Sequence, residues 1–205
     1  MAVHSTTSKQ RGTQPDKRER ILKAAIKVFA KNGFYATRVS EIAKAAGVAD
    51  GTIYLYFKNK DDVLITIFQD GLQQLLVILR DVAASDAPFD ERITRIIELQ
   101  LGLLEEQRDL AEVITVNLRQ SSSLLKQYAA PLFMEYIDVI AGLVRDGQHE
   151  GAFRKDLNPR VVARSLFGAL DAILMTWALG EDEPASLRKA ASDCAALFLE
   201  GIRAR

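Results

Sequence analysis

The sequence predicts an all-α protein in which a small N-terminal domain and a larger C-terminal domain share a long helix. The main observation is that apolar residues recur at helical spacing in almost every segment, as Ile21, Leu22 and Ala25 do near the start. Glycine or proline stands at most of the breaks between these segments, where helices begin or end. The one alternating stretch, around 113–117, is too short for a strand. We therefore expect about nine helices, and the hydrophobic content of 48% is ample for their cores.

A helix-turn-helix is predicted within residues 31–60. Its first helix covers about 39–46, and Thr37 is expected to cap it. Gly47 then lets the chain reverse, because glycine accepts the positive φ that is common just past a helix end. One apolar face of this helix is formed by Val39, Ile42, Ala43 and Ala46.

The second helix of the motif is expected to begin at Ala49 or Asp50. Ile53 and Phe57 lie four residues apart and should face inward. The outer face would then present hydroxyl groups to phosphate oxygens, and Leu55 to a thymine methyl group. An ordinary helical hairpin inside a bundle is the alternative. The residues around the outer face are Thr52, Tyr54, Leu55 and Tyr56.

Charge is distributed unevenly along the chain and favours DNA binding by this domain. Residues 1–60 hold twelve Lys and Arg against four Asp and Glu, a balance of +8, so the remaining residues carry −8 and the total is zero. A cationic segment suits a polyanion, which would repel the acidic remainder. We expect residues 1–14 to be a disordered basic tail, 15–60 the DNA-binding domain, and 61–205 a ligand-binding and dimerisation domain.

The larger domain begins with a helix over about 61–84, capped by Asn59, that would connect the DNA-binding domain to the body. Its length would let it transmit a tilt over several turns, although a static connecting helix is the alternative. Pro131 should bend one of the later helices. Those helices are predicted over 89–104, 110–118, 121–150 and 159–179, with a last one that Pro184 begins.

The last two helices are predicted to form a homodimer interface. They are more apolar than one core-facing stripe requires, and small residues would permit close approach of a second copy. Pairing would place two recognition helices on one side of a palindromic operator. The alternative is a monomer that hides both helices. The small residues are Gly168, Ala169, Ala172, Ala190, Ala191 and Ala195.

Composition argues against several other classes of protein. Cys194 is the only cysteine, which suits a reducing cytoplasm, and two histidines offer little for a metal site. The N-terminus lacks the apolar run of a signal peptide, and the apolar segment 165–180 is interrupted by Asp171 and judged too short to span a membrane. No nucleophile motif or phosphate-binding glycine loop is found, so we expect neither an enzyme nor a cofactor.

Several motifs together resemble the TetR family of bacterial repressors. They are Gly33-Phe34-Tyr35-Ala36-Thr37, Ile42-Ala43, Ala46-Gly47-Val48 and the run from Gly51 to Lys60. The resemblance implies DNA binding by a homodimer and release by a small hydrophobic effector. It departs from the family at Ala49, where serine is common, and at Asp50, whose negative charge would lie near phosphates. By implication, the DNA contacts fall on Arg38, Ser40, Ala49, Gly51, Thr52, Tyr54, Tyr56 and Lys60.

The body resembles the fatty-acid-degradation, FadR-type branch of this family at 117–121 and 166–177. That branch responds to long-chain acyl-CoA, which needs an apolar tunnel for its chain and cations for its phosphates. Arg119 and Lys126 are the candidate cations, whereas for Arg92 and Arg95 we favour surface ion pairs. The candidate ligand-binding residues are Leu72, Leu76, Asn117, Arg119, Gln120, Tyr128, Tyr136, Phe167, Asp171 and Trp177.

The resulting hypothesis is a repressor that acyl-CoA releases from its operator. The ligand would enter between the central helices, shift the helix that begins near Lys60, and change the spacing of the two DNA-binding domains. The runner-up is a repressor of a drug-efflux gene induced by a lipophilic or aromatic molecule. A helical adaptor that binds only protein would leave the +8 domain unexplained.

Overall fold

The computed structural model describes residues 16–120, 124–180 and 187–204, without the side chains of Gln120 and Leu125. The predicted tail over 1–14 and the predicted role of Pro184 therefore lie outside the described residues. The helices are α1 Lys17–Asn32, α2 Val39–Ala46, α3 Asp50–Ile53, α4 Lys60–Ala83, α5 Phe89–Glu105, α6 Arg108–Glu112, α8 Ala130–His149, α9 Pro159–Leu179 and α10 Leu187–Ile202. Three shorter turns join them: π-helical η1 Val113–Asn117, 3-10 η2 Leu118–Gln120 and π-helical η3 Leu125–Ala129.

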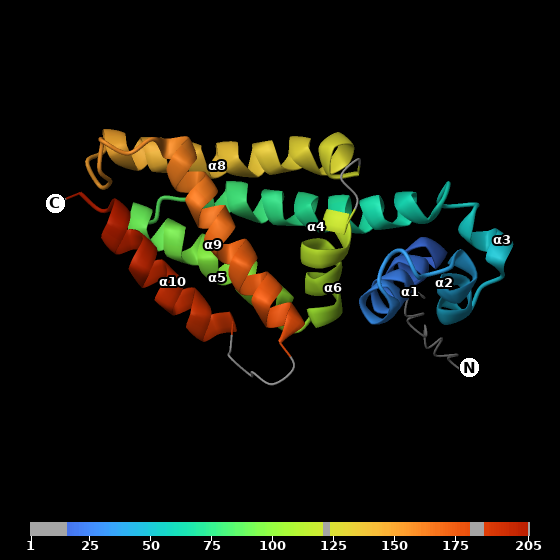
Figure 1. Cartoon of the computed structure of the whole chain (residues 1–205). Helices are drawn as coiled ribbons and strands as arrows, with labels where there is room; N and C mark the ends of the chain where they lie inside the picture. The colour runs from blue at the N-terminus through green and yellow to red at the C-terminus, as the bar shows by residue number, and fades with distance from the viewer. Residues whose placement is uncertain (1–15, 121–123, 181–186, 205) are drawn as a thin grey trace, which may run out of the picture.

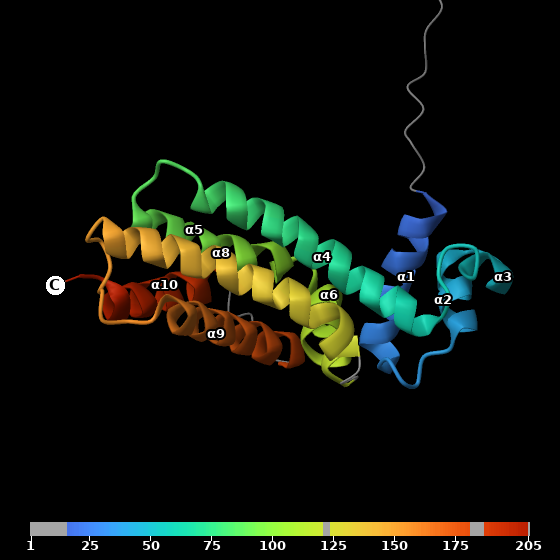
Figure 2. The ribbon, with the colours of Figure 1, turned by 90° about the horizontal axis from the view of Figure 1, so that it is seen from above.

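The all-α prediction is confirmed, and the helices form a head and a body joined by α4 (Figure 1). Helices α1, α2 and α3 lie together at one end, and α4 runs from them into the body. In the body α4 packs against α8 and α5, α9 packs against α8, and α10 packs against α5 (Figure 2). In the described ranges, β-structure is limited to one isolated antiparallel bridge between Phe153 and Arg203.

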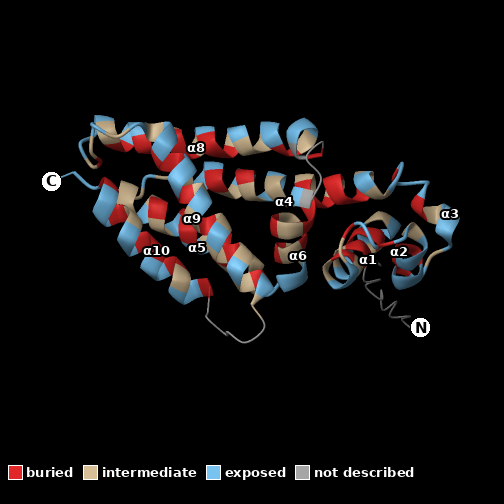
Figure 3. Ribbon diagram, in the orientation of Figure 1, coloured by how far each residue is buried: buried red, intermediate tan, exposed pale blue. Residues whose placement is uncertain are grey.

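Helix α4 contributes to two separate hydrophobic cores, which appear as buried segments at both of its ends in Figure 3. Val63, Leu64 and Phe68 pack in the head core, whereas Leu76 and Leu79 pack in the body core. The helix has 24 residues and therefore spans about 36 Å. A displacement of α4 must disturb both cores, because close-packed interiors transmit strain.

The loop between α1 and α2, residues 33–37, is held from two sides and is called the junction loop below. From α4, the Lys60 Nζ donates to the carbonyl oxygens of Phe34 at 2.6 Å, Tyr35 at 3.2 Å and Thr37 at 2.9 Å. From η1, the Oδ1 of Asn117 accepts a 2.7 Å hydrogen bond from the Phe34 backbone N–H. Asn117 is 1% exposed, so this bond is shielded from water.

One predicted helix cap in the head, Thr37 at α2, is wrong. The residue at the N-terminus of α2 is Arg38, whose backbone N–H donates to Glu41 Oε2 at 2.7 Å. Thr37 is buried instead, and its hydroxyl donates to the Gly33 carbonyl at 2.8 Å. Its side chain is thus used to close the junction loop. At α3 the cap position is occupied by Ala49, and Asp50 is an exposed residue of the first turn, without a capping bond.

The predicted cap of α4 is confirmed: Asn59 Oδ1 accepts from the Asp62 N–H at 2.8 Å. Pro131 lies in the first turn of α8, directly after the π-helical turn η3, so the helix predicted over 121–150 changes its geometry next to this proline. Proline lacks the N–H that an interior position would need, and the first turn is where that N–H would have no partner. The five-residue turn η3 immediately precedes this start.

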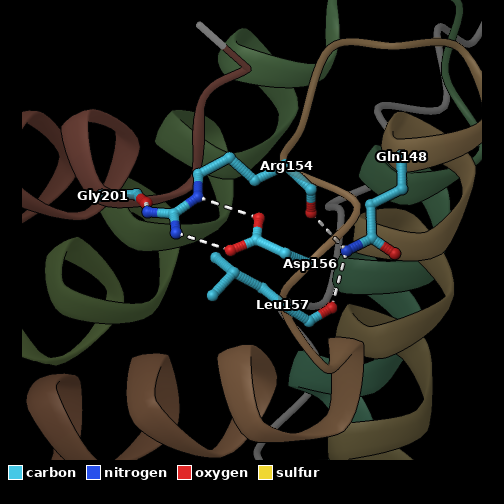
Figure 4. A network of polar contacts seen from close by, with 5 residues as sticks. All are labelled: Gln148, Arg154, Asp156, Leu157 and Gly201. Carbon is cyan, nitrogen blue, oxygen red and sulfur yellow. Dashed lines mark hydrogen bonds and ion pairs between the residues drawn. The ribbon is translucent and has the colours of Figure 1, made fainter.

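The α8–α9 loop is fastened to the end of α10 by a polar network (Figure 4). Arg154 forms a two-point ion pair with Asp156, at 3.1 and 2.7 Å, and donates to the Gly201 carbonyl at 3.1 Å. Gln148 Nε2 donates to the carbonyl oxygens of Arg154 and Leu157, at 2.7 and 2.8 Å. These bonds fix the far end of the body.

Helices α4 and α9 are both long and apolar enough to cross a membrane, judged by length and composition alone. Helix α9 has 21 residues, so the expectation that its apolar segment is too short is wrong. Both helices pack against α8, as core helices of a bundle do. Length and composition are therefore weak evidence for a membrane span in this fold.

Replacing Lys60 by methionine should destabilise the head by about 1–3 kcal/mol, because three carbonyl oxygens of the junction loop lose a charged donor. Lys58→Met is the matched control, since Lys58 is exposed and its side chain makes no hydrogen bond or ion pair with the described residues. Both variants remove one positive charge, so both should weaken nonspecific DNA binding similarly. Only Lys60→Met should lower the melting temperature, and equal melting temperatures would contradict the loop-holding role.

Replacing Gly147 by alanine should destabilise the body by about 1–3 kcal/mol through overpacking. A Cβ at this position would lie 2.4 Å from the ring of Phe153. Gly142 lies on the same helix, and a Cβ there would meet nothing within 4 Å. Gly142→Ala should therefore stabilise the protein by up to about 1 kcal/mol through helix propensity. Urea unfolding of both variants measures the difference, and destabilisation of equal size in both would refute this account of Gly147.

Candidate functional site

The outer surface of α3 and its flanking turns presents apolar and aromatic side chains to solvent. Leu55 is 80% exposed and Tyr54 57%, whereas Ile53 and Phe57 are buried, which confirms the predicted inner face. The α-helix itself is short, and a hydrogen bond from the Tyr56 N–H to the Ile53 carbonyl, 3.0 Å long, continues it as a tight turn. Exposed aromatic and hydroxyl groups on a short helix can enter a DNA groove.

Exposed cations flank this surface. Arg38, Lys44 and Lys58 are exposed and form no ion pair with the residues that the structure describes. By contrast, Arg18 pairs with Asp70 at 3.0 Å and belongs to the side of the head that faces α4. Free cations beside exposed tyrosines suit contacts with a phosphate backbone.

The eight predicted DNA contacts do not share one environment. Arg38, Ser40, Ala49, Gly51, Tyr54 and Tyr56 are exposed, and Thr52 is half-buried. Lys60 differs, because its ammonium group is directed at the junction loop and lies 4.6 Å from the centroid of the Phe34 ring. An ammonium has three N–H donors, and three carbonyl oxygens occupy them here.

The body contains an apolar cavity of about 200 Å³ between α4, α5, η1, α8 and α9. Phe133 connects two further rings of its wall, with centroid separations of 5.4 Å to Phe68 and 5.2 Å to Phe167. Exposed Gln74, Leu103 and Gln107 mark its side towards solvent. The described lining residues are Phe68, Gly71, Leu72, Gln74, Leu75, Ile78, Gln100, Leu103, Leu104, Gln107, Leu110, Ile114, Thr115, Phe133, Phe167, Asp171 and Leu174.

Several polar side chains of the lining have defined partners. The Tyr136 hydroxyl donates to Gln100 Oε1 at 2.8 Å, and burial raises the pKa of Tyr136 well above its usual value, so the phenol stays protonated. The Thr115 hydroxyl donates to the Ala111 carbonyl at 2.7 Å. Arg119 donates to Asp171 Oδ1 at 2.5 Å, which places a paired cation beside the cavity wall.

The predicted ligand-binding residues divide into three groups. Leu72, Phe167 and Asp171 line the cavity. Arg119 and Tyr136 do not line it, but they donate hydrogen bonds to the lining residues Asp171 and Gln100, respectively. The side chain of Gln120 lies outside the described residues. The others lie elsewhere in the protein. Leu76 and Tyr128 pack in or against the two cores, Asn117 binds the junction loop, and Trp177 stacks with Arg108 at 5.4 Å from its ring centroid.

Several lining residues were missed, and one of them had a signal in the sequence. Gln100 is a polar residue within the otherwise apolar stripe of α5, and a polar group on an apolar face needs a partner. Thr115 and the rings of Phe68 and Phe133 had no such signal, because they reach the cavity from three different elements. Arg95, expected in a surface ion pair, pairs with Glu98 at 3.6 Å, whereas Arg92 donates to the Ala87 carbonyl and contacts the Phe89 ring.

Two family models match consecutive parts of the chain. The model of bacterial regulatory proteins of the tetR family matches residues 21–67, and the model of the C-terminal region of YsiA-like proteins matches residues 68–201. The transition between the two matches falls at Phe68, where α4 passes from the head core towards the body.

Similar proteins include regulators of fatty acid metabolism. A fatty acid metabolism regulator protein of Bacillus subtilis is 35% identical over 163 residues, covering 80% of this chain and 84% of the relative. The structure of the fatty acid degradation regulator FadR from Bacillus halodurans matches with a TM-score of 0.85 and 33% identity, over 94% of this chain and all of that one. A Bacillus subtilis transcriptional regulator FadR in complex with stearoyl-CoA matches with a TM-score of 0.82 and 34% identity, over 90% and 99% of the two chains.

TetR-family regulators bind DNA operators and dimerise, and these relatives are transcriptional regulators rather than enzymes. The exposed α3 surface, the cationic head and the cavity in the helical body fit that description. The chain belongs to the TetR family of bacterial transcriptional regulators, and it is similar to FadR-type regulators of fatty acid metabolism.

Proposed function

We propose that this regulator is a repressor of fatty acid metabolism genes that a long-chain acyl-CoA releases from a palindromic operator. The observation that carries the proposal is the position of η1. Ile114 and Thr115 of this turn line the apolar cavity, and Asn117 of the same turn binds the junction loop of the head. A similar regulator, FadR of Bacillus subtilis, has been solved in complex with stearoyl-CoA.

The size of the cavity supports switching by the acyl chain. At about 200 Å³ it is smaller than the roughly 300–1,000 Å³ of pockets that enclose drug-sized ligands. Enclosing a whole long chain therefore requires displacement of wall residues, which belong to α4 and η1 among other elements. Such a ligand acts as an inducer because it binds the displaced state better.

The displacement reaches the head by two routes. Helix α4 carries lining residues at Phe68, Leu72 and Leu75, and its first residue, Lys60, holds the junction loop. Turn η1 holds the same loop through Asn117. Movement of either element changes the position of α2 and α3 relative to the body. Arg119 and exposed Lys126 are the proposed partners of the ligand phosphates, although Arg119 must first share or release Asp171.

The proposed DNA contacts are Arg38, Ser40, Ala49, Gly51, Thr52, Tyr54 and Tyr56, with Lys60 positioning the loop behind them. The proposed dimer interface is the exposed face of α9 and α10. Leu197 is 79% exposed on α10, and exposed Gly168 and Ala172 on α9 allow close approach. A second copy would cover these residues and present two heads to two half-sites.

A second candidate effector is a lipophilic aromatic compound, which would make the protein a repressor of a drug-efflux gene. The rings of Phe68, Phe133 and Phe167 in the cavity wall, which contact one another in tilted and edge-to-face arrangements, favour this alternative. Native mass spectrometry of the purified protein distinguishes the two, because a bound acyl-CoA and a bound aromatic compound differ in mass and in fragmentation.

The function is tested with a duplex selected by the protein from a random DNA pool. We expect palmitoyl-CoA to bind by calorimetry and to release this duplex in a gel-shift assay, because the ligand favours the displaced state. Coenzyme A alone should do neither. Binding without release, or no binding, would contradict the proposal.

Tyr54→Ala is the control for the DNA side of this assay. Tyr54 is exposed on the head and is not among the residues that line the cavity, so we expect weaker binding to the selected duplex with unchanged palmitoyl-CoA affinity. Loss of a single hydrogen bond from the Tyr54 hydroxyl corresponds to about 0.5–1.5 kcal/mol of binding free energy.

Replacing Asn117 by alanine should reduce the coupling between ligand and DNA. The change leaves the buried Phe34 N–H without an acceptor and should cost about 1–3 kcal/mol of stability. The measurement is the ratio of operator affinities with and without saturating palmitoyl-CoA, which should move towards one while ligand affinity is retained. Asn117→Asp keeps an acceptor oxygen and should retain more of the ratio. A wild-type ratio in Asn117→Ala would show that η1 does not carry the signal.

A further inference from the structure

The carboxamide nitrogen of Gln100 is a hydrogen-bond donor left unused in the wall of the cavity. Gln100 is 6% exposed, and its Oε1 accepts the Tyr136 hydroxyl, but its Nε2 donates to none of the described residues. No side-chain nitrogen or oxygen in the described ranges is both fully inaccessible and unpartnered. The accessible part of this amide therefore faces the cavity that Gln100 lines.

The partner of Gln100 determines which end of its amide faces the cavity. Tyr136 is 1% exposed and protonated, so its hydroxyl proton needs an acceptor inside the protein. Within the described part of the chain, the only acceptor of that proton is Gln100 Oε1. If the amide were turned over, the buried phenol proton would lose this acceptor. The N–H groups are consequently the atoms left for the cavity.

We propose that Gln100 Nε2 recognises an acceptor oxygen on the effector, with Tyr136 as the positioning residue that orients the amide. This inference rests on the proposed function and names a feature of its ligand. The effector carries a carbonyl or hydroxyl oxygen at the depth of Gln100, in a cavity whose other walls are mainly apolar. For an acyl-CoA, the thioester carbonyl or an oxygen on the acyl chain supplies it.

The cavity should select ligands by the group that displaces water from the Gln100 amide. A methylene group at this position would remove water from the amide and leave its N–H unpaired, whereas an oxygen would replace the lost hydrogen bond. We expect an oxygen-bearing ligand to bind about 5- to 150-fold more tightly than one that lacks the oxygen. A site built to donate a hydrogen bond discriminates in this way because its polar group is otherwise left unsatisfied.

The test compares three ligands of equal chain length by calorimetry. Palmitoyl-CoA has a thioester carbonyl, S-hexadecyl-CoA is the thioether without it, and S-(3-hydroxyhexadecyl)-CoA restores an oxygen on the chain. Preference for palmitoyl-CoA over S-hexadecyl-CoA assigns the thioester carbonyl. Equal affinity of those two, with preference for the hydroxylated thioether, assigns an oxygen on the chain. Equal affinity for all three in the wild-type protein overturns the inference.

Substitutions test whether Gln100 is responsible. Gln100→Met keeps the length of the side chain and should abolish the preference, and Tyr136→Phe should weaken it because the amide loses its orientation. Gln73→Met, at an exposed glutamine of α4 outside the cavity lining, should leave it unchanged. A preference that persists in Gln100→Met refutes the assignment.

Two measurements distinguish a failure of the Gln100 inference from a folding defect and from a failure of the proposed function. The melting temperature of each variant shows that it is folded, and Tyr136→Phe provides a second route to the answer if Gln100→Met unfolds. Failure of all three ligands to bind the wild-type protein would contradict the proposed function itself. Equal binding of all three, with operator release intact, would overturn only the role of Gln100.

Discussion

The backbone of Phe34 is a polar contact point between the head and the body. Its N–H is bound by Asn117 from the body, and its carbonyl oxygen is bound by Lys60 at the start of α4. Loss of either bond is unfavourable, because a buried backbone N–H or C=O without a partner is costly. The head is thus held in one orientation by polar bonds, which break over short displacements, as well as by apolar packing.

The apolar cavity of the body lies on the other side of the same elements. Helix α4 and turn η1 both contribute to its wall, and each ends at the junction loop. Turn η1 is π-helical, a form that is rare and frequently found at functional sites. An apolar cavity next to the elements that hold the head gives a physical means for a bound molecule to change the orientation of the head.

Much of the architecture was accessible from the sequence. Helical spacing of apolar residues, Gly47 in its left-handed conformation and the Asn59 cap are local features, so they could be predicted one segment at a time. The inner positions of Ile53 and Phe57 followed from the same periodicity. The excess of positive charge in the first sixty residues needed only counting, and it indicated the partner of the head.

Tertiary structure decided which polar residues serve the cavity and which serve the junction. Asn117 and Lys60 were both expected at ligand or DNA, yet each binds the backbone of a loop distant in sequence. Thr37 was expected to cap a helix, but its hydroxyl closes the junction loop. Gln100 lines the cavity, although helical periodicity assigned its position to the core. The physical reason is common to all four: periodicity shows which residues are buried, but a buried polar group is defined by its partner, and that partner is brought near only when the chain has folded.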